Sequence, residues 1–178
     1  MSEPQRPQAG EYNPYYHKYI ERVPDGDIRS LIRVQLADTL ALLRPLTEAQ
    51  AGHRYAEDKW TVRQVVGHMT DVERIMMYRA LRIARGDQTP LPGFDENVYA
   101  NTAGFDQRSL RSLVGELEAT RGATAALFHN LPAEAWERTG TANDNPVSVR
   151  AIAYIIAGHE LHHREILQSR YLSAVVVP

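Results

Sequence analysis

Four segments of this sequence carry apolar residues at the spacing of an α-helix, and no segment alternates apolar and polar residues as a half-buried strand does. The segments cover about residues 28–43 and 62–85, a third segment that begins at Asp106 or Ser109 and runs to about residue 131, and residues 148–172. The connections between them are long enough for crossovers. The pattern predicts an all-α protein, and four helices of this length favour a four-helix bundle.

The expected helices are bounded by capping residues. Asp27 stands before the first helix, and the pair Thr61 and Gln64 forms a capping box before the second. A similar pair at Thr47 and Gln50 predicts a short helical turn. Residues 87–105 are rich in Pro, Gly, Asp and Asn, so we expect a long loop between the second and third long helices, with one turn near residues 95–100. Loops of this length are often functional.

The length of 178 residues predicts a single domain. Residues 1–14 hold three Pro and one Gly, so we expect a flexible N-terminal arm, followed by one helical domain over residues 15–178. The beginning of the chain lacks the regions of a signal peptide, and no apolar run has the length of a membrane span. We therefore expect a cytoplasmic protein without a membrane partner.

The composition excludes several chemistries. Without cysteine the chain has no thiolate nucleophile, Cys-ligated zinc or disulfide. The net charge of −2 gives no reason to expect a nucleic-acid partner. The motifs of serine hydrolases, P-loop proteins and dinucleotide-binding folds are also missing.

The last expected helix carries histidines on its apolar face. At 100° per residue, His159 and His163 lie within roughly 30° of the centre of that face, whereas His162 lies about 90° away. Two imidazoles four residues apart can reach one metal ion. From spacing alone, a metal pair and a hydrogen-bonded core pair are equally good interpretations. His68 lies at the edge of the inward face of residues 62–85, where a core or boundary histidine is the simpler interpretation.

The string His159-Glu160-Leu161-His162-His163 also fits the H-E-x-x-H pattern of zinc peptidases. We do not favour that interpretation, because the pattern is short and no expected strand offers an edge to a peptide substrate.

Two segments of the chain resemble the DinB/YfiT-like superfamily: KWTVRQVVGHMTDVERIMMYRALRIARGD and VRAIAYIIAGHELHHREIL. The resemblance covers about residues 15–172. It implies a four-helix bundle with a divalent metal held by three histidines, which are by position His68, His159 and His163. It also implies that His162 is not a ligand. By analogy with the family we expect a homodimer, with the cluster Tyr12, Tyr15, Tyr16 and Tyr19, otherwise a packing strip, as a candidate contact.

Three neutral imidazoles suit Zn²⁺ or Ni²⁺ and leave positions open for a small-molecule substrate. The resemblance implies two uses of the ion: activation of water in a hydrolase, or activation of a low-molecular-weight thiol such as bacillithiol or mycothiol in a thiol transferase. A non-catalytic metal or small-molecule binding protein, and a bundle whose histidines only stabilise the core, stay open as alternatives.

Weaker candidates surround the expected ligands. Asp71 is placed to orient a ligand, and Glu160 is a candidate general base, although the helical wheel favours a solvent-facing Glu160. Arg79, Arg82 and Arg85 are candidates to bind the carboxylates of a thiol cofactor, although cations near a helix C-terminus are favoured whatever the function. Asp95, Glu96 and Asn97 lie in the long loop and are candidates to line a pocket mouth.

Overall fold

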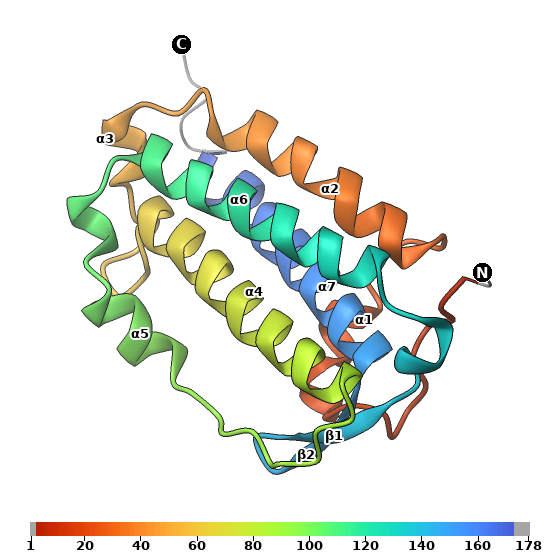
Figure 1. Ribbon diagram of the computed structural model, residues 1–178. Coiled ribbons are helices and arrows are strands. Elements are labelled where there is room, and N and C mark those ends of the chain that lie inside the picture. The colour runs from red at the N-terminus through yellow and green to blue at the C-terminus, as the bar shows by residue number, and fades with distance from the viewer. Residues whose placement is uncertain (1–2, 173–178) are drawn as a thin grey trace.

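The computed structural model describes residues 3–172, whose core is a bundle of four long helices (Figure 1). These helices are α2 (Ile28–Leu43), α4 (Val62–Ala84), α6 (Leu110–His129) and α7 (Val149–Ile166). The shorter elements are α1 (His17–Ile20), α3 (Glu48–Ala51), α5 (Glu96–Thr102), β1 (Thr139–Ala142) and β2 (Asn145–Ser148). Turns of 3₁₀-helix lie at Pro14–Tyr16, Phe105–Gln107 and Ala133–Ala135, and a π-helical segment, Leu167–Leu172, continues α7.

The capping residues begin the helices where the sequence predicts. Asp27 accepts a hydrogen bond from Arg29 N at the start of α2. Thr61 and Gln64 form a complete capping box at the start of α4, and Thr47 and Gln50 do the same for α3. Each cap satisfies backbone N–H groups that the first helical turn leaves without partners. The expected turn in the long loop is α5.

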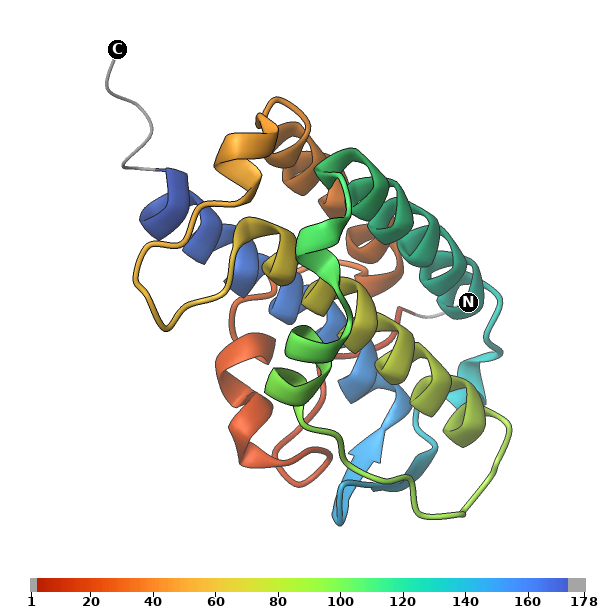
Figure 2. The ribbon, with the colours of Figure 1, turned by 90° about the vertical axis from the view of Figure 1, so that its left-hand side faces the viewer.

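The long helices pack as a ring in which α4 contacts α6 and α7, and α2 contacts the same two helices on the other side (Figure 1). The short helix α1 covers α7 (Figure 2). Two apolar clusters fill the interior, one toward each end of the bundle. A layer of buried polar side chains from all four helices separates the two clusters, and it contains Gln35, Thr39, His68, Glu73, Arg121, His159, Glu160 and His163.

A β-hairpin lies in the connection between α6 and α7, where the sequence predicts no strand. β1 and β2 are antiparallel, with Thr139 opposite Ser148, and the turn has positive φ at Asn143 (49°) and Asp144 (59°). Asn and Asp tolerate this backbone conformation, which two-residue hairpin turns require. The hairpin also holds the long loop, because Leu91 N donates to Thr141 O and Asn143 N donates to Leu91 O, both at 2.9 Å. The strands were missed because they lack an alternating apolar pattern.

The N-terminal segment lies against the bundle. Arg6 donates to Ile20 O at 2.8 Å and to Val23 O at 2.7 Å. The Glu11 carboxylate accepts two hydrogen bonds from Arg150, at 2.6 and 2.7 Å. The flexibility of the arm and the domain boundary after residue 14 stay predictions, and the tail at residues 173–178 lies outside the described residues. Within residues 3–172, no helix is both long enough and apolar enough to cross a membrane.

Candidate metal centre

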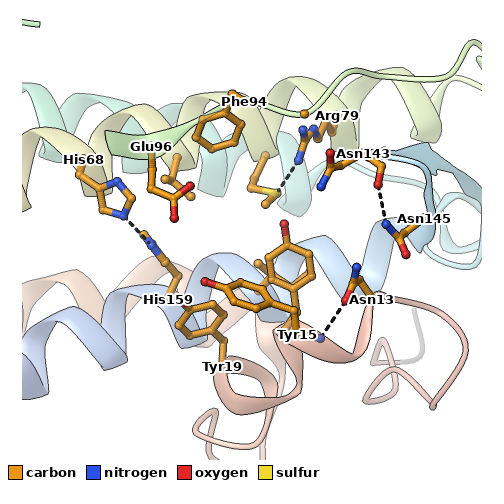
Figure 3. A pocket seen from close by; sticks show the side chains of 16 residues that line it. Asn13, Tyr15, Tyr19, His68, Arg79, Phe94, Glu96, Asn143, Asn145 and His159 are labelled. Atoms are coloured by element: carbon orange, nitrogen blue, oxygen red, sulfur yellow. Dashed lines mark hydrogen bonds between the residues drawn. The ribbon is translucent and has the colours of Figure 1, made fainter. Parts of the chain in front are cut away.

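Three histidines from two helices meet in the polar layer. His159 Nε2 on α7 lies 3.1 Å from His68 Nε2 on α4 and 3.1 Å from His163 Nε2 (Figure 3 shows the first of these contacts). One nitrogen from each ring lies within 4.8 Å of the others, and all three residues are buried. The structure therefore brings together the three residues that the resemblance implies as metal ligands. Their role as ligands stays a prediction.

The surrounding rings fix how these imidazoles lie. The Trp60 ring is centred 4.6 Å from the His68 ring, and the Tyr19 ring is centred 5.4 Å from the His159 ring. Tyr19 also contacts His162, at 5.2 Å between ring centres. His163 Nδ1 is buried without a hydrogen-bond partner among the described residues, so no carboxylate there orients this ring. Ring contacts with Trp60 and Tyr19 therefore help to hold His68 and His159 in place.

Burial keeps the three imidazoles neutral at neutral pH. It lowers the pKa of His68 to about 4, and it lowers the pKa of His159 and His163 well below the usual value, with further lowering from the neighbouring histidines. A neutral imidazole is the form that binds a metal ion, because the ligand nitrogen must offer a lone pair.

The donor set fits a divalent metal ion. Each ring nitrogen has one in-plane position, which holds either a proton or a lone pair. His159 Nε2 faces the Nε2 atoms of both His68 and His163. Whichever tautomer His159 adopts, its single proton or lone pair can make a good hydrogen bond to only one of these two atoms. A single ion that accepts one lone pair from each ring satisfies all three nitrogens at once.

A cavity of about 320 Å³ opens beside the histidines. His68 and His159 form one end of it, and Arg79 on α4 lies at the other end (Figure 3). The wall between them is partly apolar. The other lining residues are Asn13, Tyr15, Tyr16, Tyr19, Val72, Met76, Gly93, Phe94, Glu96, Ala142, Asn143, Asn145 and Ile155. The long loop, the hairpin and the N-terminal tyrosines therefore supply much of the wall. Of the three loop candidates Asp95, Glu96 and Asn97, only Glu96 is among the residues that line the cavity.

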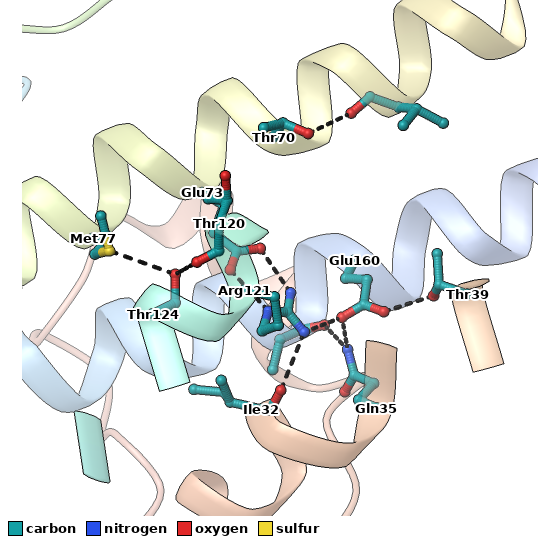
Figure 4. A network of polar contacts seen from close by, with 12 residues as sticks. Ile32, Gln35, Thr39, Thr70, Glu73, Met77, Thr120, Arg121, Thr124 and Glu160 are labelled. Carbon is teal, nitrogen blue, oxygen red and sulfur yellow. Dashed lines mark hydrogen bonds and ion pairs between the residues drawn. The ribbon is translucent and has the colours of Figure 1, made fainter. Parts of the chain in front are cut away.

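Glu160 is buried, which corrects our expectation of a solvent-facing side chain. Only 2% of the residue is exposed. Its carboxylate accepts hydrogen bonds from Arg121 at 2.6 Å, Gln35 at 2.7 Å and Thr39 at 2.6 Å (Figure 4). Arg121 also binds both oxygens of Glu73, at 2.8 Å each. Glu160 therefore lies in a buried ion network, and both of its oxygens already accept hydrogen bonds.

The other weak candidates lie in different places. Asp71 pairs with Arg74 at 3.7 Å on the side of α4 that faces α6. Arg82 pairs with Asp87 and hydrogen-bonds Tyr78, and Arg85 is exposed at the end of α4. Neither Arg82 nor Arg85 lines the cavity. Of the three arginines, Arg79 alone lines it.

Sequence reasoning missed several residues around the cavity. Asn143 and Asn145 line it from the hairpin, and Tyr15 and Tyr16 line it rather than forming only a packing strip. The Asn143-Asp144 pair is a turn signal that predicts the hairpin, but no local pattern indicates that the hairpin folds over α4.

A sequence model of the DinB superfamily matches residues 31–167. The chain belongs to this superfamily. Residues 31–167 contain His68, His159 and His163, so the histidine cluster lies within the shared region.

Two known proteins resemble the chain. A protein of Oceanobacillus iheyensis named as a candidate metal-dependent hydrolase is 27% identical over 120 residues, which are 66% of this chain and 68% of the relative. The structure of YfiT from Bacillus subtilis is described as a probable metal-dependent hydrolase with an unusual four-helix bundle topology. It superposes with a TM-score of 0.76 at 19% identity and covers 94% of this chain and 95% of YfiT. The match confirms the four-helix bundle.

A mycothiol-dependent maleylpyruvate isomerase also shares the fold. Its TM-score is 0.67 at 15% identity, and the match covers 82% of this chain. The chain spans about three-fifths of that enzyme, because the match covers 61% of its length.

Proposed function

We propose that this DinB-superfamily protein is a metal-dependent enzyme in which His68, His159 and His163 bind one divalent ion, Zn²⁺ or Ni²⁺, beside a substrate cavity. The observation that carries the proposal is the meeting of three neutral imidazoles, two of which, His68 and His159, line one end of that cavity. An ion that only stabilised the fold would be expected to have all its coordination positions filled by protein, whereas three ligands leave positions for other molecules. The names of the O. iheyensis relative and YfiT support a metal-dependent activity.

Three groups of residues would have separate roles in this enzyme: the metal ligands, the cavity wall and a proton acceptor. The three imidazoles would hold the ion, which supplies the Lewis acidity that lowers the pKa of a bound water or thiol. Tyr19 covers His159, and the apolar side chains of the cavity wall would keep bulk water from the substrate. Glu96 is the one carboxylate among the residues that line this cavity, and Figure 3 shows it between His68 and Phe94. We therefore propose it, in place of Glu160 or Asp71, as the candidate proton acceptor.

The nucleophile is either water, in a hydrolase, or a low-molecular-weight thiol, in a thiol transferase. The shared fold with a mycothiol-dependent enzyme favours testing the thiol as well as water. The alternative is a non-catalytic protein that binds the metal or a small molecule in the same cavity. Turnover separates the two enzymes from the non-catalytic alternative, and the assay in which turnover appears separates the hydrolase from the thiol transferase.

The test compares protein loaded with Zn²⁺ or Ni²⁺ with protein treated with EDTA. Hydrolysis is followed with 4-nitrophenyl acetate, and thiol transfer with mycothiol or bacillithiol and monochlorobimane, where a C–S bond forms as chloride and a proton leave. We expect turnover that needs the metal, falls at least about tenfold in His159→Ala and survives in His162→Ala. Stoichiometric metal without turnover in either assay would favour the non-catalytic alternative.

We further propose a small-molecule substrate, a cytoplasmic location and a homodimer. The cavity has the size of a small-molecule site. A thiol co-substrate is kept reduced in the cytoplasm. Tyr15 is 54% exposed beside the cavity, which suits a dimer contact. Light scattering tests the dimer, and a monomer at micromolar concentration would contradict it.

A further inference from the structure

The cavity has two chemically different ends, and both are set by one face of α4. His68 and Arg79 are eleven residues apart, so they lie on the same face of the helix and about 16 Å apart along its axis. Figure 3 shows the two side chains at opposite ends of the cavity, with Tyr15 and Tyr19 on the facing wall. A molecule that reaches the histidines and fills the cavity therefore extends toward Arg79.

Arg79 is a buried cation without an anionic partner. It is 4% exposed. Its guanidinium donates to Pro92 O at 2.7 Å, approaches Met76 Sδ at 3.8 Å and lies 5.7 Å from the centre of the Phe94 ring. Within residues 3–172, no carboxylate forms an ion pair with it. Burial of a charge without an opposite charge is costly, so this arrangement calls for an anion.

Arg121 shows what the same fold does with another buried arginine. It is 3% exposed and pairs with two carboxylates, those of Glu73 and Glu160. Both guanidinium groups are buried, but their partners differ. Arg121 pairs with carboxylates of the protein, whereas Arg79 has no such partner among the described residues and lines a cavity.

The groups around Arg79 are also suited to an anion. Asn143 and Asn145 on the hairpin line the same end of the cavity, as Figure 3 shows. Asn145 Nδ2 donates one hydrogen bond to Asn143 O, and the remaining amide N–H groups of the two side chains are donors. Burial raises the pKa of Tyr16, and the positive charge of Arg79 partly opposes that rise. The Tyr16 hydroxyl therefore lies close to Arg79. Donors and one fixed cation thus gather at this end. Glu96 is the one carboxylate that lines the cavity, and it forms no ion pair with Arg79 in the described part of the chain. The side chains between the two ends include the apolar Val72, Met76 and Ile155.

A purely structural role for Arg79 is the competing explanation. The hydrogen bond to Pro92 O ties α4 to the long loop. It uses one of the five N–H donors of the guanidinium, and the carbonyl is uncharged, so it does not account for a full buried charge. The two explanations differ in what the protein binds, which the test below measures.

We propose that Arg79 binds a carboxylate group at the far end of an elongated substrate or thiol co-substrate whose reacting end lies at the histidines. The planar guanidinium matches a carboxylate with two parallel hydrogen bonds. The inference rests on the proposed function for the position of the reacting end, but the carboxylate site itself is a property of Arg79 and its cavity.

The test uses two pairs of thiols of equal length: 6-mercaptohexanoate with 6-mercaptohexanol, and 8-mercaptooctanoate with 8-mercaptooctanol. Binding to Ni²⁺-loaded protein is followed by the absorption band that a thiolate gives on the metal. We expect at least one acid to bind about tenfold more tightly than its alcohol, because an ion-paired hydrogen bond is worth roughly that factor. Equal binding of acid and alcohol at both lengths would overturn the proposal without any variant.

Variants then assign the preference to Arg79. Arg79→Met should bring the acid down to the affinity of its alcohol, and Arg79→Lys should keep part of the preference because it keeps the charge. Arg82→Met is the matched control, since Arg82 lies on the same helix but pairs with Asp87 outside the cavity, and it should bind like the wild type. If both Arg79→Met and Arg79→Lys keep the full wild-type preference for the acid over the alcohol, the carboxylate binds elsewhere and the proposal is overturned.

A second experiment tests the carboxylate site independently of the proposed metal centre. Metal-free protein is titrated calorimetrically with octanoate and with octanol. A preference for octanoate that disappears in Arg79→Met supports the carboxylate site even if the protein proves to bind no metal. Absence of that preference, together with normal metal binding, would overturn the carboxylate site and leave the metal centre standing.

Discussion

Arg121 on α6 donates a 2.6 Å hydrogen bond to Glu160, the residue that directly follows His159 on α7. The same guanidinium binds both oxygens of Glu73 on α4, and Glu160 also accepts hydrogen bonds from Gln35 and Thr39 on α2 (Figure 4). One buried network therefore joins the four long helices at the level of the histidine cluster. It fixes the rotation of α7, and with it the direction in which His159 and His163 point.

Arg121→Met should destabilise the protein strongly. The change leaves the carboxylates of Glu73 and Glu160 buried without their cation, which typically costs about 3–5 kcal/mol of the free energy of unfolding. Arg44→Met is the control, because Arg44 pairs with Glu118 at the surface and should cost less than about 1 kcal/mol. Urea unfolding followed by circular dichroism measures both, and similar small losses in the two variants would contradict the account of the network.

Gly158→Ala should destabilise the contact between α1 and α7. A Cβ at Gly158 would overlap the backbone of Tyr19, so α1 would have to move, at a cost of about 1–3 kcal/mol. Gly115 on α6 has open space around its Cα, and Gly115→Ala should instead stabilise the protein by about 0.5–1 kcal/mol, because alanine is the better helix former. Thermal unfolding of the two variants should therefore shift in opposite directions, and a shift of equal sign would argue against the close approach.

The ion pair between Glu11 and Arg150 should make stability depend on pH. Burial raises the pKa of Glu11, but hydrogen bonds from Arg150, Gln8 and Ser148 outweigh that effect and lower it from 4.5 to about 2. A lowered pKa in the folded state means that the stabilisation is present above about pH 4.5 and is lost as the pH falls toward 2.

Glu11→Gln should therefore be less stable than the wild type by roughly 1–3 kcal/mol at pH 6, with the difference shrinking toward pH 3. Unfolding in urea at several pH values measures this difference. Glu134→Gln is the control, because Glu134 is exposed and lies 3.9 Å from Arg138, and its effect should stay small at every pH. A difference for Glu11→Gln that does not change with pH would refute the assignment.

Asp71→Asn should leave metal binding unchanged. Asp71 pairs with Arg74, and no hydrogen bond within residues 3–172 joins its carboxylate to His68. Burial is the main cause that raises the pKa of Asp71, so the neutral amide should be tolerated at this position. Elemental analysis of the variant should give the wild-type metal content, and a large loss would restore Asp71 as a residue that orients a ligand.

Much of the bundle could be predicted from the sequence because the decisive signals are local. The caps at Asp27 and Thr61 set where α2 and α4 begin, and the 3.6-residue period identifies the inward face of α7. The same period placed His159 and His163 on that face, and they are buried there.

The errors arose where a side chain depends on a distant partner. The helical wheel places Glu160 outside the apolar stripe of α7, which predicts a solvent-facing side chain. Because α1, α2 and α4 all pack against α7, that side of the helix is buried as well. A buried carboxylate there is stable only because Arg121 lies opposite, thirty-nine residues earlier in the chain. Likewise, no local pattern shows that Asn143 and Asn145 reach the cavity. The helical period alone also does not separate Arg79, which lines the cavity, from Arg82, which does not.

The metal content of single histidine variants tests the central claim most directly. Protein purified without a metal-chelating tag, and incubated with Zn²⁺ or Ni²⁺ before desalting, should hold about one equivalent by elemental analysis. His68→Ala, His159→Ala and His163→Ala should each lose that metal and keep their helical circular dichroism, whereas His162→Ala should keep it. Full metal content in any of the first three variants, or its loss in His162→Ala, would contradict the proposed three-histidine site.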